Sequence, residues 1–488
     1  MLIKFGIIIN TLGVLLMMVS LLMTSALPFS YYYGTNDNYA IFFSAITTFI
    51  SGFIFWISSR KAPKNISKRE GILIVSLGWI VISVFNALPY IYYGVFDNIT
   101  DAIFESVSGI TTTGASIISD IESIPKGLLF WRSLTQWIGG MGIIVLTVAI
   151  FPLLGIGGIE LFVAETPGPT SSKIHPRIKE TAKKLWFIYF SLTIALTIIL
   201  YYSGMSFFDA INHGLTTMAT GGFSTKNESI AFFNNTRIEY IITVFMFIAG
   251  INYTITYYII NGRFRKVWNS DEFKVYLAVV LIFIAAVSII LFFVKDIQIP
   301  DAIRISAFQI VSIMTTTGYV SADYTSWMPL LTMFFFVLLF SGGCAGSTSG
   351  GIKIIRLLVL SRISFMELKK LLHPQAIFSL KIDKKIVSSN VLSHILVFLL
   401  FYVFFFVIGT LIMTFILADF EHPLVTSIGA VASSLGNVGP AIGELGPSYN
   451  FAGIPSAGKW VLILFMLLGR LELFTLLIIF TPAFWNRN

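Results

Sequence analysis

Ten long apolar segments dominate the sequence and decide what it can fold into. They lie near residues 4–28, 38–59, 70–94, 127–153, 178–203, 236–261, 272–294, 327–361, 386–418 and 457–484, and the eighth is interrupted. Each is long enough to cross a hydrocarbon layer about 30 Å thick. Backbone groups in lipid must be satisfied within the protein, and the strong, unbroken hydropathy argues against a β-barrel, so the segments should be helices. The sequence therefore predicts an all-α polytopic membrane protein with ten transmembrane helices.

Lysine and arginine are distributed unevenly between the connecting segments. Four of these segments, at 60–69, 156–185, 261–274 and 353–385, hold most of the 32 basic residues, whereas most of the 24 acids fall on the other side. Because basic loops stay in the cytoplasm, both termini are expected there. The outer face is expected to be acidic, and an acidic surface concentrates cations.

Cysteine and histidine exclude several other functions. The single Cys344 excludes an internal disulfide and a multi-cysteine metal site, and the five histidines show no metal-ligand spacing. No combination of nucleophile, base and metal ligands occurs in the apolar segments. The chain is therefore not expected to be an enzyme or to bind a cofactor.

After the first two helices, one unit recurs four times: a helix, a short apolar segment, a glycine-containing turn and a second helix. The short segments and turns read DAIFESVSGITTTGAS, DAINHGLTTMATGGFS, AFQIVSIMTTTGYVS and TSIGAVASSLGNVG, with aligned glycines Gly114, Gly222, Gly318 and Gly436. Each segment is too short to span, so it should enter the membrane and return on the outer side. Four units of one orientation favour a central axis. The expected domains are an N-terminal pair of helices at 1–60 and pseudo-fourfold repeats at 61–160, 161–265, 266–365 and 366–488.

The four turns are predicted to form an ion filter. A short helix that enters from outside points its partly negative C-terminal end at the membrane centre, where four such ends favour a cation. Carbonyl groups of the turn can replace a hydration shell, and the glycine permits a positive φ. The second turn has two adjacent glycines, so its register is open by one residue. The candidate filter residues are Thr111, Thr112, Thr113, Gly114, Ala219, Thr220, Gly221, Gly222, Thr315, Thr316, Thr317, Gly318, Ser433, Ser434, Leu435 and Gly436.

A glycine-rich stretch at 342–351 interrupts the eighth apolar segment. Five glycines and three hydroxyl residues in ten positions cannot form a stable helix. Irregular backbone at this depth should line a pore or a wet vestibule, where it could act as a gate. The alternative is a surface of small residues for close helix packing. The candidate gate residues are Gly342, Gly343, Gly346, Ser347, Thr348, Gly350, Gly351 and Arg470.

Arg470 lies near the middle of the last apolar segment. A charge there costs from about 3 to above 10 kcal/mol, so its side chain must face protein or water. Glu472 is two residues away on another face of the helix and is not a natural partner. Arg470 is expected either to form an ion pair between helices or to act as a barrier to cations beside the glycine-rich stretch.

Four stretches carry a family resemblance: WRSLTQWIGGMGI (131–143), AETPGPTSSKIHPRIKETAKKLW (164–186), SGGCAGSTSGGIKIIR (341–356) and LLGRLELFTLL (467–477). They resemble the Trk/Ktr/HKT superfamily of potassium transporters, most closely its bacterial TrkH-type uptake subunits. The resemblance implies a homodimer in the bacterial inner membrane with one potassium pore per protomer. It also implies a TrkA-like cytoplasmic partner that binds nucleotides, K+ at the filter residues, and a gating role for 342–351 and Arg470. Serine at the position of Gly114 goes with sodium-permeable members, so glycine there implies potassium.

Two alternative functions remain open. The chain could be a channel that does not discriminate potassium from sodium, or a potassium symporter coupled to protons or sodium. A symporter usually needs acidic side chains within the membrane, and Glu105 and Glu472 are the candidates.

Overall fold

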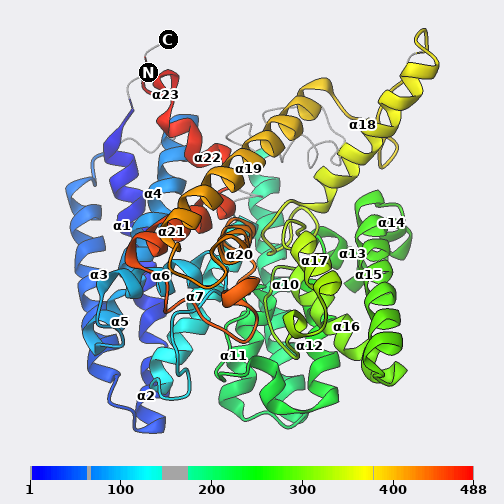
Figure 1. Cartoon of the computed structure of the whole chain (residues 1–488). Helices are drawn as coiled ribbons and strands as arrows, with labels where there is room; N and C mark the ends of the chain where they lie inside the picture. Colours follow the sequence, from blue (N-terminus) through cyan, green and yellow to red (C-terminus); the bar gives the residue numbers. More distant parts are fainter. Residues whose placement is uncertain (1–2, 63–66, 146–173, 377, 487–488) are drawn as a thin grey trace.

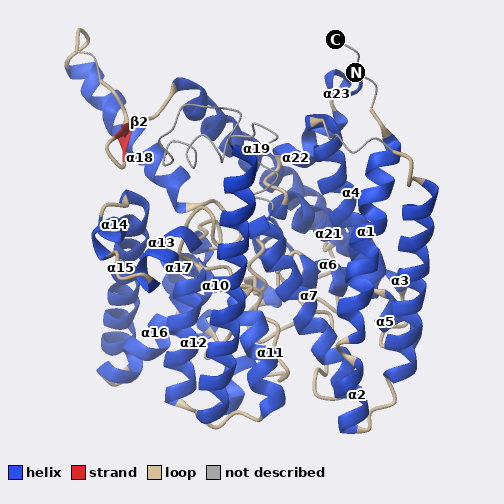
Figure 2. Ribbon diagram, turned by 180° about the vertical axis from the view of Figure 1, so that it is seen from behind, coloured by secondary structure: helices blue, strands red, loops and turns tan. Residues whose placement is uncertain are grey.

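The computed structural model describes residues 3–62, 67–145, 174–376 and 378–486. Regular structure in these residues is helical except for a hairpin of two short strands, β1 (Lys381–Ile382) and β2 (Lys385–Ile386) (Figure 2). The end of the predicted span at 127–153 falls outside the described residues, as does most of the basic segment at 156–185.

The N-terminal unit contains α1 (Phe5–Thr24), α2 (Leu27–Tyr33) and α3 (Asn38–Ser58). Helices α1 and α3 pack closely because Gly13 and Gly52 face one another. A Cβ atom at either glycine would lie less than 3.0 Å from the backbone of the other helix. Helix α1 also contacts α4, where the Lys4 amide donates to Glu70 at 2.9 Å.

The helices of the four predicted repeats follow in chain order (Figure 1). The first two contain α4 (Lys68–Asn86), α5 (Leu88–Tyr93), α6 (Ile99–Ile110) and α7 (Lys126–Val145), then α10 (Ile174–Tyr202), α11 (Phe207–Met218), η2 (Ser229–Phe233), α12 (Thr236–Ala249), α13 (Tyr253–Ile260) and α14 (Phe264–Trp268). The last two contain α15 (Asp271–Lys295), α16 (Ile299–Met314), η3 (Tyr324–Ser326), α17 (Pro329–Leu338) and α18 (Ile354–Leu372), then α19 (Ser389–Ile416), α20 (Pro423–Gly436), η4 (Gly443–Leu445), α21 (Ser456–Arg470), α22 (Phe474–Leu477), η5 (Ile478–Phe480) and α23 (Pro482–Trp485). Serine side chains at 67, 206 and 270 cap the first turns of α4, α11 and α15 by accepting backbone amides.

Six helical runs are long and apolar enough to cross a membrane: Phe5–Tyr33, Asn38–Ser58, Arg69–Tyr93, Lys183–Tyr202, Asp271–Lys295 and Ser389–Ile416. Two more candidates are broken: α12 and α13 meet at 113°, and α21 meets the run Phe474–Phe480 at 109°. Eight candidate spans in the described residues compare with the ten predicted. Helix α7 falls short because buried polar side chains interrupt its apolar sequence, and the eighth predicted span holds only the ten residues of α17 before an irregular loop.

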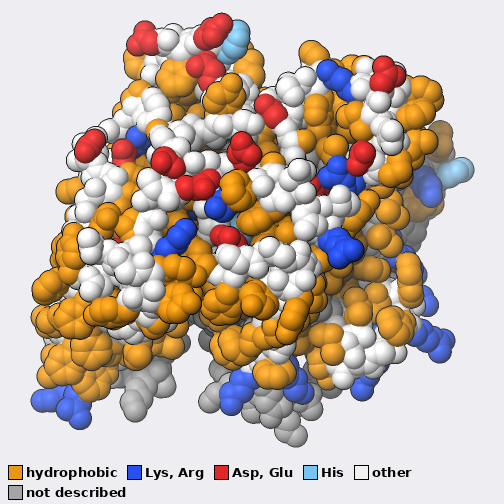
Figure 3. Space-filling model, turned by 90° about the horizontal axis from the view of Figure 1, so that it is seen from below, with side chains coloured by type: hydrophobic (Ala, Val, Ile, Leu, Met, Phe, Trp, Pro, Cys, Tyr) orange, Lys and Arg blue, Asp and Glu red, His pale blue; other side chains and the backbone are white. Residues whose placement is uncertain are grey.

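The short helices α6, α11, α16 and α20 lie inside the bundle, between the longer helices (Figure 1). Both chain termini lie at one end of the molecule, and α18 projects from that same end. The opposite end carries scattered acidic side chains, with lysine and arginine side chains among them, on a mostly uncharged surface (Figure 3). The short helices therefore bring the four predicted turns to the middle of the molecule.

Candidate functional site

The four short helices end in the same kind of turn. One residue in each turn has a left-handed backbone, with φ of 52–57°. These residues are Thr112, Thr220, Thr316 and Asn437. The next amide donates to the carbonyl five residues earlier at 2.8–3.0 Å; these amides belong to Thr113, Gly221, Thr317 and Val438. A glycine with φ of 76–102° follows: Gly114, Gly222, Gly318 and Gly439. The backbone thus closes each helix with a Schellman motif.

This shared geometry fixes the register of the second and fourth turns. In the second turn Gly222 matches Gly114, and Gly221 stands where the first and third turns have threonine. The predicted alignment of the fourth turn at Gly436 is wrong by three residues, because α20 continues through Gly436 and the turn glycine is Gly439. Asn437 ends α20, since asparagine adopts the left-handed conformation more readily than most residues. Ser433, Ser434 and Leu435 consequently lie within α20.

The four turns form a closed ring in which glycines alternate with carbonyl oxygens. A Cβ atom on Gly114 would lie less than 3.0 Å from the Gly221 oxygen, and a Cβ on Gly222 equally close to the Thr317 oxygen. A Cβ on Gly318 would meet the Val438 oxygen in the same way, and one on Gly439 would lie 2.7 Å from the Thr113 oxygen. Only glycine allows this approach. Four carbonyl oxygens are thereby collected at the C-terminal, partly negative ends of four helices, which favours a cation there.

Threonine hydroxyls hold the first and third turns. The hydroxyls of Thr111 and Thr113 lie 2.7 Å apart, and those of Thr315 and Thr317 are equally close. The Thr111 hydroxyl also donates to the Val107 carbonyl at 2.6 Å. All four side chains are buried. These hydroxyls therefore stabilise the turns, and the backbone carbonyls supply the ring.

An irregular loop at 341–353, here called the glycine loop, connects α17 to α18 and contacts two of the turns. The Gly350 amide donates to the Thr316 hydroxyl at 2.6 Å, and the Thr348 hydroxyl accepts from Thr220 at 3.2 Å. Thr348 also donates to the Met218 carbonyl at 3.1 Å. The predicted gate residues in 342–351 all lie in this loop, and their lack of helix is as expected from the glycines.

Helix α21 ends at Arg470, at the 109° bend, and the Arg470 side chain connects the glycine loop to α7. Its Nη1 donates to the Thr348 carbonyl and its Nη2 to the Gly139 carbonyl of α7, each at 3.0 Å. Arg470 is 3% exposed and forms no ion pair with any described residue. The structural ion pair considered for Arg470 is therefore absent from the described part of the chain, and two carbonyl groups hold its charge.

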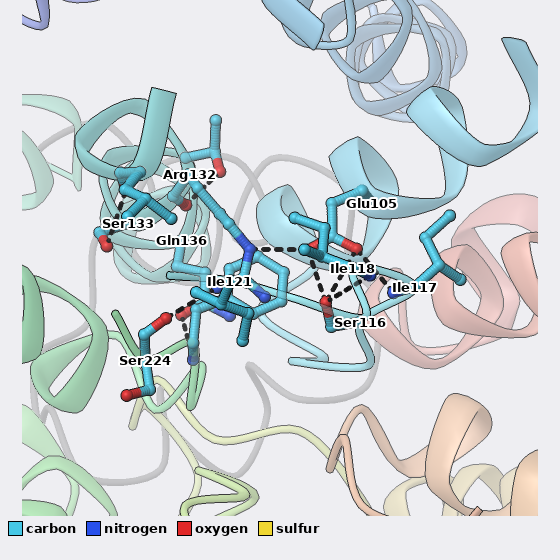
Figure 4. Close-up of polar contacts among 12 residues, drawn as sticks. Glu105, Ser116, Ile117, Ile118, Ile121, Arg132, Ser133, Gln136 and Ser224 are labelled. Atoms are coloured by element: carbon cyan, nitrogen blue, oxygen red, sulfur yellow. Dashed lines mark hydrogen bonds and ion pairs between the residues drawn. The ribbon is translucent and has the colours of Figure 1, made fainter. Parts of the chain in front are cut away.

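Glu105, one of the two candidate coupling acids, is fully buried in an ion pair (Figure 4). Arg132 Nε lies 2.7 Å from its carboxylate, which also accepts from the Ser116 hydroxyl and the Ile117 amide. Arg132 Nη1 donates to the Ser224 carbonyl at 3.1 Å. The pair thus joins the segment that follows the first turn to the segment that follows the second.

A second set of contacts connects the β1–β2 hairpin to the glycine loop. The amide of Asp271 donates to the Asp383 carboxylate at 2.6 Å, and the amide of Asp383 donates back to Asp271 at 3.1 Å. The next residue of α15, Glu272, accepts the Ala345 amide of the glycine loop at 2.6 Å. Glu472, the other candidate coupling acid, forms an ion pair with Arg356 of α18.

Polar contacts also join loops that are far apart in the sequence. Lys459 lies 2.7 Å from Asp101, which connects the last unit to the first. The Asn227 amide group donates to Asp120 at 3.0 Å, and this hydrogen bond lowers the pKa of the Asp120 carboxyl below its usual value.

Five residues of this site are absent from the sequence prediction: Arg132, Gln136, Asn437, Val438 and Gly439. Two signals could have revealed them. The spacing Asn-x-Gly at 437–439 repeats the left-handed residue and glycine of the other turns. Arg132 and Gln136 are polar residues four apart in an apolar helix, where polar side chains usually have a function.

Known proteins resemble this chain over nearly its whole length. A family model described as "TrkH: Cation transport protein" matches residues 38–487. The Trk system potassium uptake protein TrkH of Salmonella typhimurium is 39% identical over 440 residues, which are 89% of this chain and 90% of that protein. The protein of the same name from Vibrio parahaemolyticus is 38% identical over 492 residues, covering 99% of this chain and 100% of that protein.

A solved structure shares the fold. The crystal structure of the potassium transporter TrkH from Vibrio parahaemolyticus matches with a TM-score of 0.89 at 37% identity. The match covers 99% of this chain and 100% of that one.

Proposed function

The chain belongs to the TrkH family of cation transport proteins, and we propose that it is the potassium-translocating subunit of a bacterial potassium uptake system. Relatives named as potassium uptake proteins support the choice of ion. The ring of four turns supports a route for that ion through the chain itself.

The closed alternation of glycines and carbonyl oxygens carries this proposal. Carbonyl oxygens at a ring of turns replace the hydration shell of a cation, and here the Thr113, Gly221, Thr317 and Val438 oxygens would bind K+. A glycine at position 114 supports selectivity for potassium, as the family resemblance implies. With the fourth turn realigned, each of the four turns still contributes a glycine.

The proposed architecture has ten transmembrane helices, with four pseudo-fourfold repeats around one pore and both termini in the cytoplasm. The position of both termini at one end of the molecule supports a common side for them. The repeat boundaries predicted above remain proposals, as do the inner-membrane location, the homodimer and the TrkA-like partner.

The glycine loop and Arg470 are proposed to form the gate. The loop contacts the second and third turns on the side of the ring nearest α18, and Arg470 holds it to α7. A partner on the cytoplasmic side would open the pore by moving this loop.

Passive transport is favoured over coupled transport. The two acids that could couple potassium to protons, Glu105 and Glu472, are both in ion pairs with arginine. Protonating either acid would leave a partly buried arginine unpaired, which is costly.

Uptake of radioactive rubidium into proteoliposomes tests the proposal. The chain alone is compared with empty liposomes, in competition with potassium or sodium, and with or without a pH gradient. Block by potassium but not by sodium, unchanged by the gradient, is the expected result. Equal block by sodium would contradict selectivity, and uptake that requires the gradient would establish a symporter instead.

A further inference from the structure

The second turn of the ring lacks the side chains that hold the first and third. Ala219 and Gly221 occupy the positions where those turns have two threonines with hydroxyls 2.7 Å apart. The second turn therefore cannot form this hydroxyl pair. Its carbonyl oxygen also belongs to the peptide between Gly221 and Gly222, where neither residue has a Cβ atom to restrict rotation.

The side chain of Gln136 occupies the space left by the missing threonine. Gln136 lies on α7 and is fully buried (Figure 4). A Cβ atom on Gly221 would lie less than 3.0 Å from Cδ, Oε1 and Nε2 of Gln136. The glutamine and a side chain at position 221 therefore exclude one another.

Gln136 also forms two hydrogen bonds with the backbone of the second turn. Its Nε2 donates to the Gly221 carbonyl at 2.6 Å, and its Oε1 accepts the Phe223 amide at 3.1 Å. Because a carbonyl can only accept and a backbone amide can only donate, these two partners fix the orientation of the side-chain amide. One turn away on the same face of α7, Arg132 holds the Ser224 carbonyl at 3.1 Å. Helix α7 thus holds the segment 221–224 at three backbone atoms.

The Gly221 oxygen is one of the four ring oxygens. Among the described residues, it is the one ring oxygen that accepts a hydrogen bond from a side chain. This bond fixes where the oxygen lies and withdraws part of its negative charge from the ring. We propose that Gln136 is a positioning residue that sets the second turn of the filter and thereby the preference of the pore for potassium over sodium.

This inference rests on the proposed function, and the two can fail separately. In the rubidium assay the unmodified chain tests potassium selectivity itself. For each variant, the sodium concentration that blocks uptake by half is divided by the potassium concentration that does so. A change in this ratio tests the role of Gln136. That ratio does not depend on how much folded protein each preparation contains.

Gln136→Met keeps the length of the side chain and removes both hydrogen bonds. The sodium-to-potassium ratio should fall about fivefold, which corresponds to about 1 kcal/mol, the contribution of one such bond. Gln309→Met is the matched control, because Gln309 is a buried glutamine that bonds Ala322, four residues beyond the ring glycine of its own turn. The control should leave the ratio within twofold of the unmodified chain.

A rescue variant separates positioning from general stability. Gln136→Ala with Ala219→Thr and Gly221→Thr places in the second turn the threonine pair that holds the first and third. It should restore the ratio to within twofold of the unmodified chain. An unchanged ratio in Gln136→Met would overturn the proposal. If Gln136→Met does not fold, a rescue variant that folds but does not discriminate between the ions would overturn it as well.

Discussion

If Arg470 and the glycine loop form the proposed gate, replacing Arg470 by alanine should open the pore of the isolated chain. Arg470 donates to the Thr348 carbonyl of the glycine loop and to the Gly139 carbonyl of α7. Hydrogen bonds from a charged donor contribute about 1.5–3 kcal/mol each, so the pair favours the closed loop by about 3–6 kcal/mol. At about 1.4 kcal/mol for each factor of ten, the ratio of closed to open loop should fall about 100- to 20,000-fold.

Rubidium uptake into proteoliposomes, without any partner protein, measures this change. Uptake by Arg470→Ala should exceed that of the unmodified chain at least tenfold, with an upper limit set when every pore is open. Arg470→Lys distinguishes two causes. Lysine keeps the positive charge but cannot match both guanidinium bonds. If the bonds to the loop keep the pore closed, uptake by Arg470→Lys should lie between the other two.

One result would refute the reasoning. If Arg470→Ala elutes as a single folded species on size exclusion and its uptake stays within twofold of the unmodified chain, the two bonds do not close the pore. Uptake by Arg470→Lys equal to that of the unmodified chain, with raised uptake in Arg470→Ala, would instead assign the effect to charge alone.

Three further changes test other parts of the structure. Gly439→Ala should lower rubidium uptake at least tenfold, because Gly439 has φ of 102° and its Cβ atom would lie 2.7 Å from a ring carbonyl oxygen. Uptake by the control Ser434→Ala, whose buried hydroxyl has no partner among the described residues, should stay within twofold of the unmodified chain. Loss of uptake in Ser434→Ala but not in Gly439→Ala would show that the fourth turn is misaligned. Glu105→Gln leaves Arg132 buried without its ion pair and should destabilise the chain by about 3–5 kcal/mol. The loss should appear as a lower thermal unfolding temperature in detergent. Combining Glu105→Gln with Arg132→Met should recover most of it. Asp383→Ala removes the contact between the β1–β2 hairpin and α15 and should raise hydrogen exchange in the glycine loop about fivefold, whereas unchanged exchange would argue against this connection.

Much of the fold could be predicted because lipid leaves few choices for an apolar segment. Long apolar runs become helices, and the glycines at 342–351 interrupt one, as the structure shows. The breaks within the sixth and tenth segments could not be predicted from hydropathy. The first break depends on the backbone conformation at Gly250–Asn252. The second depends on that at Glu472–Leu473, where both residues adopt positive φ although both have side chains. The family resemblance is confirmed by the matches over nearly the whole chain.

The candidate site was harder to predict, since its geometry depends on contacts between distant segments. The threonine-glycine turns predict three of the four ring glycines, but Gly436 is predicted for the fourth where the structure has Gly439, because a glycine alone does not show where a helix ends. The sequence does not predict Gln136 for a related reason. Its role becomes visible only when Gly221, far along the chain, is seen to lie against it.

The ring also sets the order in which this protein can be completed during synthesis. Asn437 in the last turn donates to the Thr113 hydroxyl in the first at 3.0 Å, across 324 residues of sequence. Contacts this distant in sequence form late, and a growing chain has three turns in the membrane before the fourth is made. A ribosome that stalls before α20 leaves a ring with one side missing. A complete ring of turns is therefore among the last features that the nascent chain acquires.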